Sequence, residues 1–117
     1  MMRLLTDREA RPREKSALRR LVELFPDAIA MRIPVLVSVP RGRGQDLEEN
    51  TALEYGTSRI VFFESRLPLE LDDKLCLKNT DGSLQTEAIV VALRLNEGKR
   101  AVAARFVAEV RNWIVRG

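Results

Sequence analysis

The sequence predicts an all-β domain, built as a small six-stranded antiparallel barrel or sandwich. Short runs of β-branched, apolar and aromatic residues recur at a spacing of roughly 8–12 residues. Turn-forming sequences separate several of these runs, most clearly at residues 79–82 and 96–99. The chain has 117 residues, which suits one domain and leaves no room for a second folded unit with a linker.

Six strands are expected along the chain. The first lies between Pro34 and Pro40 and places Val35, Val37 and Val39 on one face. The other five are expected at residues 47–55, 60–63, 72–78, 84–95 and 100–107.

The N-terminal part, residues 1–26, is expected to be a basic arm followed by an amphipathic helix at residues 13–25. Pro26 ends the helical pattern. The spacing of a single apolar helix face is followed by Leu18, Leu21, Val22 and Phe25. This face is expected to pack on the domain, to bind a protein partner, or to pair with a second copy of the chain.

The remaining part, residues 27–117, is expected to hold the barrel and a short C-terminal helix at residues 108–116. Val110, Trp113 and Ile114 fit helical spacing there. We expect this helix to act as an apolar cap on an open end of the barrel.

The composition points away from catalysis and toward a binding module. The chain contains no His and a single Cys, Cys76, which excludes His-based triads, Cys/His zinc sites and disulfides. Adjacent acidic pairs occur at residues 48–49 and 72–73, but neighbouring side chains of a strand point to opposite faces. We therefore predict no enzyme, no catalytic residue, no metal and no cofactor.

The ends and the charge bear on location and partners. The N-terminus lacks the apolar run of a signal peptide, and the longest apolar stretch, residues 88–93, is too short to span a membrane. With a lone cysteine, these features favour a cytoplasmic protein. The net charge of +3 makes the chain mildly basic, which favours anionic ligands.

An ordered series of features carries a family resemblance. Arg32 precedes the first apolar strand. A Pro-Leu pair at residues 68–69 is followed by a turn and then by the apolar strand expected at residues 72–78. Phe106 lies at the end of the last strand. In this order the stretch from Arg32 to Val107, about two thirds of the chain, resembles a PilZ domain. The resemblance implies a six-stranded PilZ-like barrel and, for many members of the family, binding of the second messenger cyclic di-GMP.

The family's ligand signature is not intact in this chain. The signature has two motifs. The first is Arg-Arg-x-x-x-Arg before the first strand, and the second is Asp/Asn-x-Ser-x-x-Gly between the second and third strands. When Arg32 is aligned with the last arginine of the first motif, Asp27 and Ala28 occupy the positions of its first two arginines. In the second motif only Thr57 keeps a chemical similarity, to the serine. The resemblance therefore implies a signalling module that binds a protein partner and binds cyclic di-GMP weakly or not at all.

Two alternatives remain open from the sequence. The first is a cyclic di-GMP receptor that uses substitute ligand residues, namely Arg19, Arg20, Arg32, Thr57, Ser58 and Arg59. The second is a small barrel that binds nucleic acid, which the scarcity of aromatic residues disfavours. Phe62 and Phe63 are adjacent on a strand, so one of them is expected to face solvent; Tyr55 is the other candidate.

Overall fold

The computed structural model describes residues 16–40 and 46–108. The arm expected at residues 1–13 and all but the first residue of the C-terminal helix expected at 108–116 lie outside these ranges. One short helix precedes six strands in the described part of the chain. The elements are α2 (Ala17–Val22), β2 (Ile29–Val39), β3 (Leu47–Gly56), β4 (Ile60–Ser65), β5 (Lys74–Asn79), β6 (Gln85–Asn96) and β7 (Lys99–Phe106).

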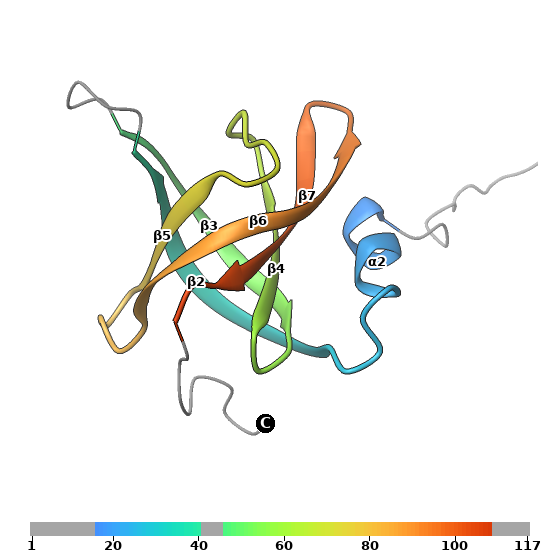
Figure 1. The fold of residues 1–117 in the computed structure, drawn as a ribbon, viewed down its shortest axis with the longest axis horizontal. Helices are drawn as coiled ribbons and strands as arrows, with labels where there is room; N and C mark the ends of the chain where they lie inside the picture. Colours follow the sequence, from blue (N-terminus) through green and yellow to red (C-terminus); the bar gives the residue numbers. More distant parts are fainter. Residues whose placement is uncertain (1–15, 41–45, 109–117) are drawn as a thin grey trace, which may run out of the picture.

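The six strands form a closed barrel (Figure 1) in the order β2-β3-β4-β7-β6-β5. Every neighbouring pair is antiparallel. The structure therefore confirms the all-β class and selects the barrel over the sandwich. Closure gives each of the six strands a hydrogen-bonding neighbour on both sides over part of its length, which satisfies backbone groups that an open sheet exposes at its edges.

Among the strand boundaries that differ from the sequence prediction, the starts of β2 and β5 have local reasons. β2 begins at Ile29 and continues through Pro34, because β5 pairs with β2 only over Val35 to Ser38. A proline is tolerated where one side of a strand has no partner. β5 begins at Lys74 because Asp72 adopts a φ of 72° and so belongs to a turn.

The barrel interior is the first hydrophobic core. Val35, Val37 and Val39 of β2 all point into it, as the alternation in the sequence predicted. Phe63 and Leu77 reach the same core from β4 and β5. Side chains from strands distant in sequence thus meet inside one closed wall.

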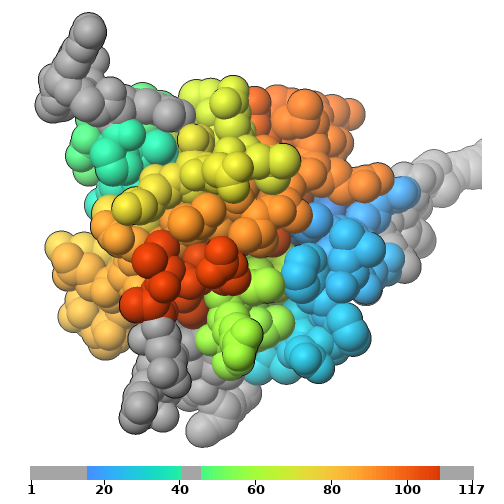
Figure 2. Space-filling view, in the orientation of Figure 1, coloured from blue at the N-terminus to red at the C-terminus, as the bar shows by residue number. Residues whose placement is uncertain are grey.

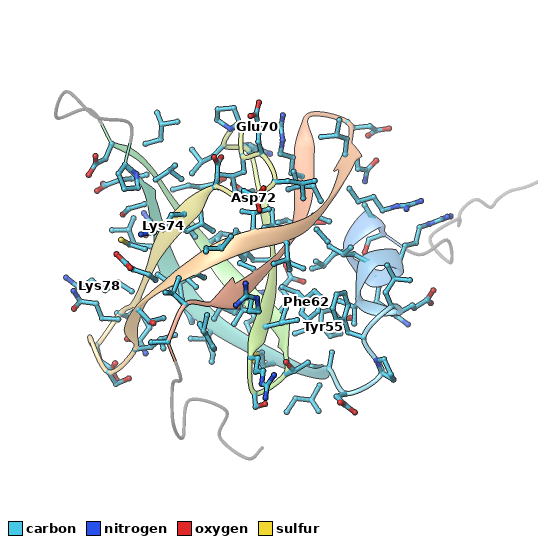
Figure 3. All side chains as sticks on the ribbon, in the orientation of Figure 1. Tyr55, Phe62, Glu70, Asp72, Lys74 and Lys78 are labelled. Atoms are coloured by element: carbon cyan, nitrogen blue, oxygen red, sulfur yellow. The ribbon has the colours of Figure 1, made fainter. Side chains whose placement is uncertain are left out.

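A second core lies outside the barrel wall, beneath α2. Phe62, Ala101 and Ala103 point outward from β4 and β7 and are covered by Leu18 and Leu21 of the helix. The small alanine side chains let the helix approach the strands closely. Tyr55 and Phe62 lie between the barrel and α2 (Figure 3).

This second core corrects one expectation and shows which alternative holds for the helix. Phe62 and Phe63 are both fully buried, so neither faces solvent as was expected of one of them. Of the alternatives for the helix face, the structure shows packing on the barrel of its own chain: Leu18 and Leu21 are buried there, and Val22 and Phe25 are partly buried. The outward faces of β4 and β7 are too apolar to remain in water, and the helix covers them.

The helix is shorter than predicted at its C-terminal end. Ser16 caps its N-terminus, where the Ser16 Oγ accepts a hydrogen bond of 3.1 Å from the Arg19 N–H. It ends at Val22 and not at Phe25, since Leu24 and Phe25 donate to carbonyls only three residues back. Phe25 then meets Phe62 edge-on, with ring centroids 5.0 Å apart. Within the described residues, no helix has the length and apolar character needed to cross a membrane.

Candidate functional site

The first candidate site is a groove beside the turn that joins β3 to β4. It is lined by residues 24–27 and Ile29 on one side and by residues 56–60 on the other, and encloses about 610 Å³. We call it the turn groove. The chain entering β2 after the helix thus lies opposite the turn that carries Thr57, Ser58 and Arg59, three of the six residues predicted as ligand contacts.

Hydrogen bonds fix the shape of this turn. The Thr57 hydroxyl oxygen accepts from the backbone N–H groups of Arg59 and Ile60, each at 3.0 Å. The Thr57 N–H donates to the Ile60 carbonyl at 2.8 Å, and the Arg59 carbonyl accepts from the Phe106 N–H at 2.9 Å. Thr57 therefore shapes the turn, and only its hydroxyl hydrogen is left for another acceptor.

The charges of the turn groove do not favour an anionic ligand. Arg59 is the cation of its lining, and Asp27 lies in the same lining with a carboxylate. An arginine fork suits phosphate and the guanine edge, whereas a nearby carboxylate repels phosphate oxygens. The two charges cancel over the groove as a whole.

The remaining predicted contacts are not gathered there. Arg19 and Arg20 are exposed on α2, and Arg32 is exposed on β2. None of these three belongs to the turn groove lining. Arg20 lines a different groove. The structure thus groups Thr57, Ser58 and Arg59 and separates them from the other three arginines.

The second candidate site is an apolar groove between α2 and β6. It encloses about 850 Å³ and is lined by Arg20, Leu21 and Leu24 from the helix end, residues 69–71 of the loop before β5, residues 91–95 of β6, and Arg100. We call it the helix–β6 groove. In Figure 2 the helix (blue) lies beside the β6–β7 hairpin (orange). Glu70, its acidic residue, is labelled on the loop in Figure 3.

Sequence reasoning missed the helix–β6 groove. The strand expected at residues 84–95 contains the longest apolar stretch, residues 88–93, and such a run is typical of a strand buried on both faces. The structure buries Ala88 and Val90 but leaves Val91 and Leu95 exposed, because β6 extends past the barrel into a hairpin. No local signal in the sequence distinguishes the two halves of this strand.

Glu49 and Asp73, one from each adjacent acidic pair, have structural partners. The Glu49 carboxylate accepts from the Ser65 hydroxyl at 2.6 Å and from the Arg66 N–H at 3.0 Å. Asp73 accepts from the Glu70 N–H at 2.9 Å. No group of three or more potential metal ligands occurs within the described ranges.

The polar side chains of the turn between β5 and β6 also have structural partners. The Asp81 carboxylate accepts from the Ser83 N–H at 2.8 Å. This hydrogen bond, with a further one from the Ser83 side chain, lowers the pKa of Asp81 below its ordinary value. The Asn79 side chain donates to the Ser83 hydroxyl and accepts from the Leu84 N–H, at 2.8 and 3.0 Å. These bonds account for the polar residues of the turn without a ligand.

Comparison with known proteins adds no family assignment. No family model matches the chain, and no match to a curated protein is found.

Proposed function

We propose that the chain is a non-enzymatic PilZ-like interaction module that binds a protein partner and binds cyclic di-GMP weakly or not at all. The proposal joins the PilZ-like order of features in the sequence to a barrel of six antiparallel strands. Its main support is the separation of the six predicted ligand residues, of which only Thr57, Ser58 and Arg59 line the turn groove.

The separation of these residues lowers the affinity expected for a dinucleotide. A charge-assisted hydrogen bond contributes about 1.5–3 kcal/mol, so the loss of two arginine contacts to phosphate or guanine weakens binding by at least two orders of magnitude. Asp27 adds repulsion in the same groove. Weak or absent dinucleotide binding is the expected result.

Calorimetric titration with cyclic di-GMP tests this proposal. We expect no saturable binding up to about 100 μM dinucleotide, a concentration that detects any Kd in the micromolar range. Micromolar binding by the full chain that is lost in Arg59→Ala and kept in Arg105→Ala would contradict it. That result would support the receptor hypothesis with substitute ligand residues.

The nucleic-acid hypothesis receives no support from the aromatic residues. Phe62 and Phe63 are fully buried, and Tyr55 is half-buried beneath the helix, so none of the three offers an open ring for base stacking. Salt-dependent binding to single-stranded DNA or RNA would be needed to revive this hypothesis.

A further inference from the structure

Within residues 16–40 and 46–108, the outer part of β6 has a strand neighbour on one side only. On one side, β5 pairs with β6 from Gln85 to Ile89. On the same side, the Val90 carbonyl accepts from the Asp72 N–H and the Val90 N–H donates to the Asp73 carbonyl, each at 2.9 Å. From Ala92 to Asn96, among the described strands, β6 pairs with β7 alone. A register shift between Val90 and Ala92 marks a bulge there, and bulges bend a strand away from its neighbour.

The helix–β6 groove follows this open edge. Consecutive residues of β6, from Val91 to Leu95, all line it. Successive side chains of a strand point to opposite faces of the sheet. A groove lined by side chains from both faces therefore runs along the edge of the strand.

Large apolar side chains remain in water around the groove. The exposed fractions are 71% for Leu24, 58% for Leu71, 69% for Leu95 and 37% for Val91. They come from the helix end, the loop before β5 and β6, so they converge on the groove from separate elements. Clustered exposed apolar residues of this kind mark interaction surfaces.

The charged residues that line the groove indicate the charge of a partner that would bind there. Arg20, Arg94 and Arg100 line it together with a single acidic residue, Glu70. Arg100 also donates to the Leu67 carbonyl at 3.5 Å, while Arg20 and Arg94 are exposed. A second copy of the chain would bring arginines against arginines, whereas an acidic partner would neutralise them.

We propose that the helix–β6 groove binds an extended acidic segment of another protein, which adds as a strand to the open edge of β6. Backbone groups of Ala92 to Asn96 would pair with the segment. Its apolar side chains would contact Leu24, Leu71 and Leu95, and its carboxylates would pair with Arg20 and Arg94. This inference rests on the proposed function and supplies the partner's chemistry.

Selection from a displayed library of random dodecapeptides tests it on the full chain. We expect the enriched peptides to carry excess Asp and Glu and to alternate them with Leu, Ile, Val or Phe. Amide chemical shifts of residues 91–96 should move when such a peptide is added. Arg94→Glu and Leu95→Asp should each weaken its binding by about tenfold or more.

Matched variants control for charge and hydrophobicity outside the groove. Arg105 and Val107 are exposed residues that do not line it, so Arg105→Glu and Val107→Asp should bind the peptide as the parent chain does. Because Arg94 and Leu95 are also exposed, all four variants should fold, which circular dichroism checks.

Several outcomes would overturn the inference. These are no enrichment, enriched peptides without acidic excess, or binding that Arg94→Glu and Leu95→Asp leave unchanged. A dimer in light scattering, or binding to vesicles containing phosphatidylglycerol, would also overturn it if Leu95→Asp abolished the effect, since a second copy or a membrane would then occupy the groove. Tight cyclic di-GMP binding would count against the proposed function instead, so the two failures are distinguishable.

Discussion

At the scale of single residues, Ser65 shows how the barrel satisfies a buried polar group. It is 2% exposed at the end of β4. Its hydroxyl donates to Glu49 at 2.6 Å and accepts from the Leu67 N–H at 3.0 Å. Glu49 also accepts from the Arg66 N–H, so one carboxylate and one hydroxyl hold the chain as it leaves β4.

Replacing this hydroxyl should cost stability. In Ser65→Ala the Leu67 N–H loses its acceptor and Glu49 loses a donor, which predicts a loss of about 1–3 kcal/mol in the free energy of unfolding. Urea denaturation measures it. Ser58→Ala, an exposed serine in the β3–β4 turn, is the matched control and should change the value by less than about 0.5 kcal/mol. Equal losses in the two variants would show that the network at Ser65 contributes nothing.

At the scale of elements, the β6–β7 hairpin is set by its two-residue turn. Asn96 pairs with Lys99, and the two residues between them have positive φ, 50° for Glu97 and 83° for Gly98. This is the backbone of a type I′ turn, which suits the twist of paired strands. Asparagine and glycine are favoured at its first central position, so Glu97 is a strained choice.

The two turn residues should therefore respond in opposite directions. A Cβ at Gly98 would meet nothing within 4 Å, so any cost of Gly98→Ala comes from backbone conformation alone. We expect that variant to lose about 1 kcal/mol of stability and Glu97→Asn to gain a few tenths. Thermal unfolding of both variants, with exposed Lys78→Ala as a control, tests this. A gain in Gly98→Ala would contradict the assigned turn.

At the scale of the whole molecule, one barrel wall separates two hydrophobic cores. Phe63 points inward from β4 and Phe62 points outward beneath α2, and both are 0% exposed. A six-residue helix has too few hydrogen bonds to be stable in isolation, so its stability depends on this packing. The same contact places Leu24 and Arg20 along the edge of β6, which forms the helix–β6 groove.

The two-core arrangement predicts similar penalties on both faces of β4. Phe62→Leu and Phe63→Leu should each lower the free energy of unfolding by about 1–2 kcal/mol, since each removes buried apolar surface. Leu95→Ala, on an exposed side chain, should change it by less than about 0.5 kcal/mol. Hydrogen exchange should show faster exchange of the α2 amides in Phe62→Leu than in Phe63→Leu. Equal exchange in both would mean that Phe62 does not hold the helix.

The sequence by itself determined most of the architecture. Alternation such as Val35, Val37 and Val39, together with the turns at residues 79–82 and 96–99, placed the strands close to their observed positions. These signals are local, because strand periodicity and turn chemistry depend on residues a few positions apart. One short helix, Ala17–Val22, lies within the range predicted as helical, and its end at Val22 depends on the turns that follow it.

Only the tertiary structure decided which surfaces are open. Phe62 is buried because a helix about forty residues earlier in the chain covers it, and Leu95 is exposed because β5 does not extend alongside it. The arginines predicted to act together are separated for the same reason, with Arg20 in the helix–β6 groove and Arg59 in the turn groove. Exposure and proximity depend on contacts between distant parts of the chain, and short-range patterns in the sequence do not encode them.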